Sequence, residues 1–332
     1  MMRSFLIAAV FFLALAVPAH AFGVQDATAP DPDDKPLAIR IWYPSGSGND
    51  AKISGTALPL IIISHGTGGS LMGHTDTAIA LAQAGFVVAA VNHTGDNYKD
   101  DSYVGRGLHL IGRPRHISRV IDYMLTLWPE HARIDPARIG MFGHSAGGFT
   151  ALVIAGAEPD MSRGVVHCRE HPSAWDCLYL EKHGLKLRER PASSPPLVWP
   201  RDARVKAAVI AAPAVGYAFE PNGLSKVAIP IQLWEAEKDT IVDDSPATVR
   251  RLLPEKPDDH LVPGAGHLSF IAPCDWRLNA IVTVMSWFRT LNFCADPAGF
   301  DRPTFHKAFN TAVIDFFLRT LPPQPRLASP SR

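Results

Sequence analysis

The segment Gly143-His144-Ser145-Ala146-Gly147 constrains the fold of this chain more than any other stretch. It follows a short apolar run at residues 138–142 and precedes a longer apolar run at 149–157 that suits a helix. Glycines on both sides of the serine let the backbone make a tight turn without side-chain clashes. A strand, a Gly-x-Ser-x-Gly turn and a helix in this order form a nucleophile elbow, which exposes the serine hydroxyl above the end of a sheet. Because the pentapeptide alone also occurs in ordinary turns, the flanking elements carry the prediction that Ser145 is a nucleophile.

A serine nucleophile needs a base, and the base needs an acid that fixes its tautomer. A short apolar run ends at residues 261–262, and the glycine-rich loop after it holds His267, the predicted base. Residues 229–234 are typical of a buried strand, and Asp239 follows its carboxyl end. Asp239 is therefore the favoured acid. The nearby carboxylates that remain alternatives are Glu235, Glu237, Asp243 and Asp244.

The order Ser145, Asp239, His267 is that of α/β-hydrolases and differs from the orders in chymotrypsin-like and subtilisin-like enzymes. Alternating strands and helices favour the same class, an α/β fold with a mostly parallel central sheet and helices on both faces. The strands are expected at residues 37–43 (at an edge), 60–64, 86–91, 138–142, 205–211, 229–234 and 260–262. The helices are expected near residues 76–84, 116–127, 146–157, 246–253, 276–291 and 305–321.

Acyl transfer also requires backbone N–H groups directed at the developing oxyanion. The run at residues 60–64 ends in a glycine-rich loop at 65–69, where backbone can approach a substrate closely. We expect the N–H groups of Thr67 and Ala146 to be the two donors. A phosphate-binding loop is the competing interpretation, but this segment lacks the Gly-Lys-Ser/Thr end of a P-loop.

These segments resemble the dienelactone-hydrolase-like α/β-hydrolases, in the branch that includes platelet-activating-factor acetylhydrolase-type esterases. The resemblance extends from about Trp42 to about Phe270 and also includes Trp42-Tyr43-Pro44, Gly85-Phe86-Val87-Val88, Asn92-His93 and residues 135–140. It implies Ser145, Asp239 and His267 as a catalytic triad, with Thr67 and Ala146 as oxyanion donors. Dienelactone hydrolases proper use a cysteine where this chain has Ser145, so a general carboxylic ester hydrolase is the better interpretation.

Such an enzyme works through an acyl-enzyme and needs no metal or organic cofactor. We expect a small-molecule ester with a short acyl chain as substrate, with polymeric esters such as polyester or cutin as the main alternative. A peptidase of the prolyl-oligopeptidase type has a similar elbow but normally carries a propeller or gating domain, for which the stretch before Leu60 leaves no room. A non-catalytic binding protein would be expected to lack triad members, and all three are present here. The sequence makes no prediction of oligomeric state.

The amino end predicts export. Arg3 precedes an apolar run at residues 5–17 that is too short to span a membrane, and Ala19-His20-Ala21 fits a signal-peptide cleavage site. We therefore expect a signal peptide at 1–21, cleaved after Ala21, and a periplasmic or secreted product. A retained membrane anchor is the alternative interpretation.

In an oxidising compartment, the four cysteines are expected to form disulfides. Three pairings are possible, and the pairing local in sequence is Cys168–Cys177 with Cys274–Cys294. A zinc site at Cys168, Cys177, His167 and His171 is the alternative, although its spacing fits no common zinc motif.

Composition and length add limits. The 332 residues are 47% hydrophobic, and 32 Lys and Arg balance 32 Asp and Glu, so no overall basic field favours nucleic acid. We expect one hydrolase domain at residues 37–321 between a flexible segment at 22–36 and a flexible tail at 322–332. Residues 161–204 are predicted to form a cap-like insert in which Trp175 and Trp199 wall the acyl pocket. The cluster Arg106, Arg113, Arg115 and Arg119, with His109 and His116, is interpreted as a solvated helix face.

Overall fold

The computed structural model describes residues 21–46, 52–190, 197–286 and 292–322. Within them an eight-stranded sheet runs in the order β1-β2-β4-β3-β5-β6-β7-β8. β2 pairs antiparallel with β1 and β4, and all the other pairs are parallel. The strands are β1 (Ala21–Ala29), β2 (Leu37–Ser45), β3 (Leu58–Ser64), β4 (Val87–Val91), β5 (Ile134–His144), β6 (Val205–Ala211), β7 (Ile231–Ala236) and β8 (Asp258–Val262). The predicted mostly parallel sheet is confirmed.

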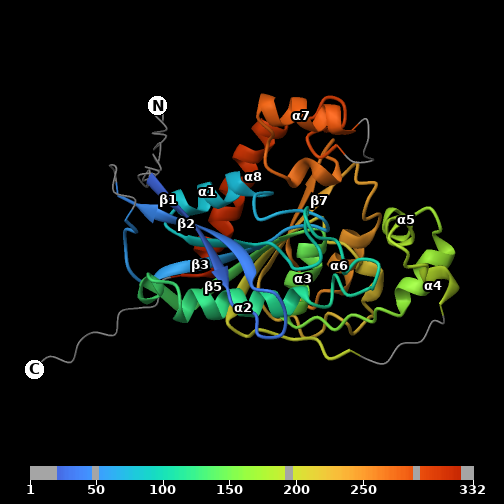
Figure 1. Ribbon diagram of the computed structural model, residues 1–332, viewed down its shortest axis with the longest axis horizontal. Coiled ribbons are helices and arrows are strands. Elements are labelled where there is room, and N and C mark those ends of the chain that lie inside the picture. The colour runs from blue at the N-terminus through green and yellow to red at the C-terminus, as the bar shows by residue number, and fades with distance from the viewer. Residues whose placement is uncertain (1–20, 47–51, 191–196, 287–291, 323–332) are drawn as a thin grey trace, which may run out of the picture.

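Helices cover both faces of this sheet (Figure 1). They are α1 (Thr75–Gln83), α2 (Arg113–Thr126), α3 (Ala146–Ala155), α4 (Arg163–Glu170), α5 (Trp175–Lys182), α6 (Ser245–Leu252), α7 (Trp276–Ser286) and α8 (Arg302–Thr320). The short 3₁₀ turns are η1 (His131–Arg133), η2 (Leu187–Glu189), η3 (Gly216–Ala218) and η4 (His267–Phe270). Buried side chains of α1 and α8 form a hydrophobic core on one face of the sheet, and those of α2, α3 and α6 form a second core on the other face.

The central strand β3 shows why the sheet is sandwiched in this way. All seven of its residues are buried, and its side chains alternate between the two cores. Leu60 and Ile62 pack on the α2 and α3 side, whereas Ile61 and Ile63 pack on the α1 and α8 side. Every residue of α3 is also buried, as expected for a helix that is apolar all round. β5, which pairs with β3 and leads into the glycine-serine turn, and α3, which follows the turn, are therefore held in the centre of the molecule.

The expectation of a flexible segment at residues 22–36 is wrong. Residues 21–29 form β1, which pairs with β2 over its full length, so β1 rather than β2 lies at the edge of the sheet. The prolines that suggested disorder lie in the connection between these strands, where Asp34 N donates to Asp31 O at 3.2 Å. The side chain of Asp31 is fully buried and lies 3.1 Å from Arg115. A proline-rich turn with a buried carboxylate thus joins two strands.

The predicted insert at 161–204 leaves the layered core and carries α4, α5 and η2, which lie to one side of the sheet in Figure 1. The disulfide Cys168–Cys177 joins α4 to α5, and a second disulfide joins Cys274 to Cys294, so the pairing local in sequence is confirmed. No helix among the described residues is long and apolar enough to cross a membrane. The predicted signal peptide lies outside the described residues except for Ala21, as does the predicted tail except for Pro322.

Candidate active site

Ser145 lies on the predicted elbow, between the end of β5 and the start of α3. Its backbone has φ 56° and ψ −118°, a region that side-chain-bearing residues rarely adopt. Three hydrogen bonds hold this conformation: Ser145 N donates to Ala211 O at 2.9 Å, and Ser145 O accepts from Phe149 N and Ala214 N at 3.1 Å each. A Cβ on Gly147 would lie 1.9 Å from Ser64 O, so the flanking glycine is required by close approach.

His267, at the start of η4, is paired with the favoured acid. Its Nδ1 lies 2.7 Å from Asp239 Oδ2, and the two side chains are only 5% and 4% exposed. Asp239 Oδ1 also accepts from the amides of Ile241 and Val242, at 2.8 and 3.1 Å. Burial raises the pKa of Asp239, but the His267 ring and these amides more than offset it, so the pKa lies below its usual value. The ionised carboxylate fixes the proton on Nδ1 and leaves Nε2 as the basic nitrogen.

The elbow and the His267 loop are in direct contact. Nε2 of His144, the residue before Ser145, lies 3.0 Å from His267 O, and the centres of the two rings are 4.8 Å apart. Among the described residues the Ser145 hydroxyl has no hydrogen-bond partner, which leaves it available to His267 Nε2. Hydrogen bonds of this kind are often long in unliganded enzymes and shorten when substrate binds.

The alternative carboxylates have other partners or positions. Glu235 pairs with Arg250, and Glu237 accepts from Gly264 N at 2.7 Å. Asp244 precedes the first residue of α6. Asp243 lines the cavity in front of Ser145 but makes no contact with His267. Of the five carboxylates considered, only Asp239 contacts the histidine.

Thr67 and Ala146 are the predicted oxyanion donors. Both line the same cavity as Ser145. Neither backbone N–H has an acceptor among the described residues. In the 65–69 loop, the amides that donate are those of Gly68 and Gly69. Two free donors beside one serine hydroxyl can stabilise an oxyanion on a carbonyl carbon that the serine attacks.

A buried ion pair that the sequence analysis missed supports this loop. Arg113 Nε donates to Asp96 Oδ2 at 2.9 Å, and both side chains are fully buried. Arg113 also donates to the carbonyls of His65 and Gly66, at 2.6 and 3.1 Å. Asp96 Oδ1 accepts from Gly68 N at 2.8 Å. The interpretation of Arg113 as part of a solvated helix face is therefore wrong. His116 is buried as well, because it lies on the side of α2 that packs against the sheet.

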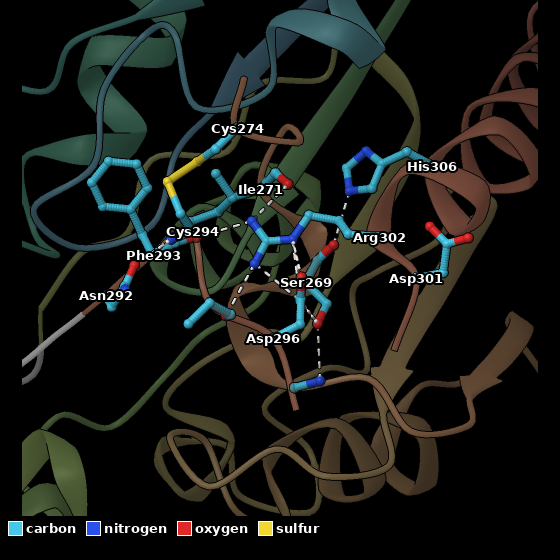
Figure 2. A network of polar contacts seen from close by, with 12 residues as sticks. Ser269, Ile271, Cys274, Asn292, Phe293, Cys294, Asp296, Asp301, Arg302 and His306 are labelled. Carbon is cyan, nitrogen blue, oxygen red and sulfur yellow. Dashed lines mark hydrogen bonds and ion pairs between the residues drawn. A yellow bond between two sulfur atoms is a disulfide. The ribbon is translucent and has the colours of Figure 1, made fainter. Parts of the chain in front are cut away.

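A second buried arginine supports the His267 loop (Figure 2). Ser269, two residues after His267, accepts from Gly266 N at 3.0 Å and donates to Asp296 Oδ1 at 2.6 Å. Arg302 pairs with Asp296 at 2.9 Å and donates to the carbonyl of Phe293, next to the Cys274–Cys294 disulfide. The disulfide-closed segment is thus fastened to the loop that carries the histidine.

The cavity in front of Ser145 has a volume of about 430 Å³. The cap supplies much of its wall, including Met161, Val165, Trp175, Tyr179 and Leu180. Trp175 and Tyr179 stack with their ring centres 4.8 Å apart. The expectation for Trp199 is wrong: it packs on Phe149 in the core and donates to Pro159 O, because α3 offers it an apolar surface away from the cavity.

His167, Asp176 and Cys177 place possible metal-ligand atoms within 4.8 Å of one another. The sulfur of Cys177 is bonded to Cys168, however, so it is not a thiolate. The zinc interpretation rested on both sulfurs, and the residues present do not fit it.

Comparisons with known proteins agree with this description. The family model of platelet-activating factor acetylhydrolase, isoform II, matches residues 20–105, and that of the prolyl oligopeptidase family matches residues 74–169. No curated protein sequence gives a significant match. Among solved structures, a ferulic acid esterase from Streptomyces cinnamoneus is similar over 96% of both chains, with 20% identity and a TM-score of 0.61.

Two further structures share the fold at lower identity. A dienelactone hydrolase from Anabaena variabilis is similar over 91% of this chain and all of its own, with 17% identity and a TM-score of 0.52. A puromycin-hydrolyzing peptidase from Mycobacterium tuberculosis is similar over 94% of this chain but only 41% of its own, with 15% identity and a TM-score of 0.57. These matches show that the chain has the α/β-hydrolase fold. The resemblance to dienelactone hydrolases and platelet-activating-factor acetylhydrolases that its motifs predict is confirmed.

Proposed function

We propose that this protein is an exported serine hydrolase that cleaves carboxylic esters through a Ser145–His267–Asp239 triad. The observation that carries the proposal is the buried 2.7 Å contact between His267 Nδ1 and Asp239, in a loop that touches the strained elbow of Ser145. A histidine oriented in this way beside a serine hydroxyl is the arrangement that activates serine in acyl transfer.

In the proposed reaction, His267 Nε2 accepts the hydroxyl proton as Ser145 Oγ attacks the ester carbonyl. The amides of Thr67 and Ala146 stabilise the oxyanion, and Asp239 stabilises the imidazolium. The imidazolium then gives its proton to the departing alkoxide, which leaves an acyl-enzyme. Water deprotonated by His267 cleaves the acyl-enzyme and restores the serine.

The cavity supports a preference for compact acyl groups. A volume of about 430 Å³, closed on one side by α4 and α5, suits a small ester better than a long lipid chain. We therefore expect acyl chains up to roughly butyrate or hexanoate to be preferred. Polymeric esters remain the alternative substrate class. A cavity of about 430 Å³ would admit only one polymer chain at a time.

Export is part of the same proposal. It rests on the signal-peptide pattern of residues 1–21 and on the two disulfides, which form in oxidising compartments. Cleavage after Ala21 would leave almost all of β1 in the mature protein. Amino-terminal sequencing of the protein recovered from the periplasm or medium tests this step, and a mature end within β1 beyond Phe22 would contradict it.

The catalytic proposal is tested with Ser145→Ala. This variant should lose nearly all hydrolysis of p-nitrophenyl esters while its unfolding transition is nearly unchanged, because the Ser145 hydroxyl has no hydrogen-bond partner among the described residues and is a single atom. A serine-directed phosphonate should label the unmodified protein at Ser145 and leave the variant unlabelled. Near-normal turnover by the variant, or labelling at another residue, would disprove the assignment.

Peptide hydrolysis is a second candidate, because the prolyl oligopeptidase model covers the elbow itself. The same triad chemistry cleaves amides when the leaving amine is protonated. Peptide p-nitroanilides assayed beside p-nitrophenyl esters and a polyester film separate these possibilities. A kcat/KM for a peptide that exceeds that of every ester would favour the peptidase.

A further inference from the structure

A polar cluster in the cavity wall consists of His167 from α4, Asp176 from α5 and Tyr217 from η3, and its hydrogen bonds and ion pairs within the described residues reach none of the proposed triad residues. Asp176, the second residue of α5, accepts from Tyr217 OH through Oδ2 at 2.7 Å and from Cys177 N through Oδ1 at 2.9 Å. His167 Nε2 lies 3.4 Å from Oδ1, and its ring stacks on Tyr217 with centres 3.9 Å apart. All three side chains line the cavity that contains Ser145. The proposed triad chemistry makes no use of them.

Oδ2 of Asp176 has room for another hydrogen-bond donor. An ionised carboxylate accepts about four hydrogen bonds. Asp176 Oδ1 has two nitrogen neighbours, whereas Oδ2 has only the Tyr217 hydroxyl among the described residues. The Asp176 side chain is 25% exposed, so a ligand in the cavity can reach it. Because the tyrosine hydrogen already points at the carboxylate, the cluster offers a ligand acceptors.

The charge state of the cluster supports this accounting. Burial raises the pKa of Asp176, but His167 and Tyr217 more than offset it, so the pKa lies below its usual value and the carboxylate is charged. Burial, followed by the charge of Asp176, raises the pKa of Tyr217 well above its usual value, so the phenol keeps its proton. The group that completes Oδ2 must therefore be a hydrogen-bond donor.

The remaining charges select a neutral donor over a cation. Arg106 and Arg190 line the same cavity, as does Asp243. Two positive and two negative side chains leave the cavity without a net negative charge that would attract an ammonium group. A hydroxyl group satisfies Oδ2 without adding charge, and hydrogen bonds to charged groups are about twice as strong as neutral ones.

We propose that the Asp176–Tyr217–His167 cluster is a subsite for a substrate hydroxyl group, so that the preferred ester carries an alcohol or phenol remote from its scissile carbonyl. This inference rests on the proposed ester hydrolysis. Trp175, next to Asp176 and stacked on Tyr179, gives the cavity that contains Ser145 an aromatic wall beside the cluster. A ring that bears the hydroxyl can pack on it.

The test uses matched ester pairs. Methyl 3-(4-hydroxyphenyl)propanoate is compared with the unsubstituted and 4-aminomethyl analogues, and 4-hydroxyphenethyl acetate with phenethyl acetate, to place the hydroxyl on the acyl or the alcohol side. In one of the two series we expect the hydroxylated ester to have a kcat/KM roughly tenfold above its unsubstituted partner, the size of one charge-assisted hydrogen bond. Asp176→Asn should reduce this ratio to near one, because the amide is a weaker, uncharged acceptor. Glu170→Gln, at an exposed carboxylate of α4 that does not line this cavity, is the matched control and should keep the ratio.

Binding separates this inference from the catalytic proposal. The same ester pairs are titrated into Ser145→Ala, where the ratio of dissociation constants measures the subsite without turnover. A ratio near one in both series, or an unchanged ratio in Asp176→Asn, would overturn the subsite whatever the catalytic result. A higher affinity for the aminomethyl analogue, which is protonated at neutral pH, would overturn it in favour of a cation site. If the protein binds the esters with the expected ratio but hydrolyses none, the subsite stands and the proposed function fails.

Discussion

Acid should unfold this protein well before its carboxylates titrate, because several histidines are buried in neutral form. Burial is the largest cause, and it lowers the pKa of His65 to about 3 and the pKa of His74 and His116 to about 4. Arg113 beside His65 and Arg115 beside His116 act in the same direction. In the unfolded chain these rings titrate near the ordinary value of 6.5. The unfolded state therefore binds more protons below that value, and stability falls as the pH drops from 6.5 towards the folded pKa values.

The size of this effect follows from the shifts. One pKa unit corresponds to about 1.4 kcal/mol, so at about pH 5 each of the three histidines lowers the free energy of unfolding by about 2 kcal/mol relative to neutral pH. Together they remove roughly 6 kcal/mol, which is comparable to the whole stability of many domains. Between about pH 6 and 5 these three histidines alone should change the free energy of unfolding by roughly 4 kcal/mol per pH unit. Burial also lowers the pKa of His93 and of His144 well below the usual value, so the measured slope should be at least this large.

Urea unfolding followed by tryptophan fluorescence at a series of pH values, with the disulfides oxidised, measures this slope. His116→Gln should lower it by about one proton, or about 1.4 kcal/mol per pH unit. His131→Gln, at an exposed position, is the matched control and should leave it unchanged. A slope of about one proton or less in the unmodified protein would refute the conclusion that these rings are buried and neutral.

Three other predictions concern the site. Asp239→Asn should lower kcat by about 10⁴-fold, the loss expected when the orienting acid is removed, whereas Asp244→Asn should stay within a few fold; the opposite result in an ester assay would exclude Asp239 as the acid. Arg113→Lys should lower kcat by roughly tenfold with a smaller change in KM. The single ammonium nitrogen of lysine cannot occupy the positions of the three guanidinium nitrogens that reach Asp96 and the two loop carbonyls. An unchanged kcat in a folded variant would show that the buried pair does not position the predicted oxyanion loop. Replacement of both Cys168 and Cys177 by serine should broaden acyl-chain preference more than it changes turnover of the shortest p-nitrophenyl ester, and equal preference would make the bridge structural only.

The elbow and the order of the proposed triad residues could be read from the sequence because they depend on local sequence. Gly143 and Gly147 are required because a Cβ at either position would lie 2.1 Å or less from a backbone oxygen. The strand and the helix on either side of Ser145 are visible in the sequence as apolar runs. Asp239 and His267 each follow a strand, and parallel strands bring their carboxyl ends to one edge of the sheet. The contact between the two side chains then follows from topology.

The supports of the site were not predictable in the same way. Asp96 and Arg113 lie in loop and helix-start segments without a period, and only the fold shows that they meet under the oxyanion loop. Asp31 and its prolines suggested disorder because composition was considered without the partner strand β2. Trp199 was placed in the pocket by its position in the insert, whereas the apolar surface of Phe149 decides where it packs. Each error comes from a contact between residues distant in sequence.

The two buried arginines explain how loops can hold the proposed catalytic groups at the edge of the sheet. Backbone carbonyls in the 65–69 loop and in the segment at 293–296 have no strand beside them, and buried carbonyls need donors. Arg113 and Arg302 each satisfy two or more such carbonyls and one aspartate, and a guanidinium offers five donors in a fixed plane. Removal of either carboxylate would leave a buried charge unpaired, which is more destabilising than the absence of the pair. These pairs therefore fix loop geometry, and the proposed triad and oxyanion amides depend on that geometry.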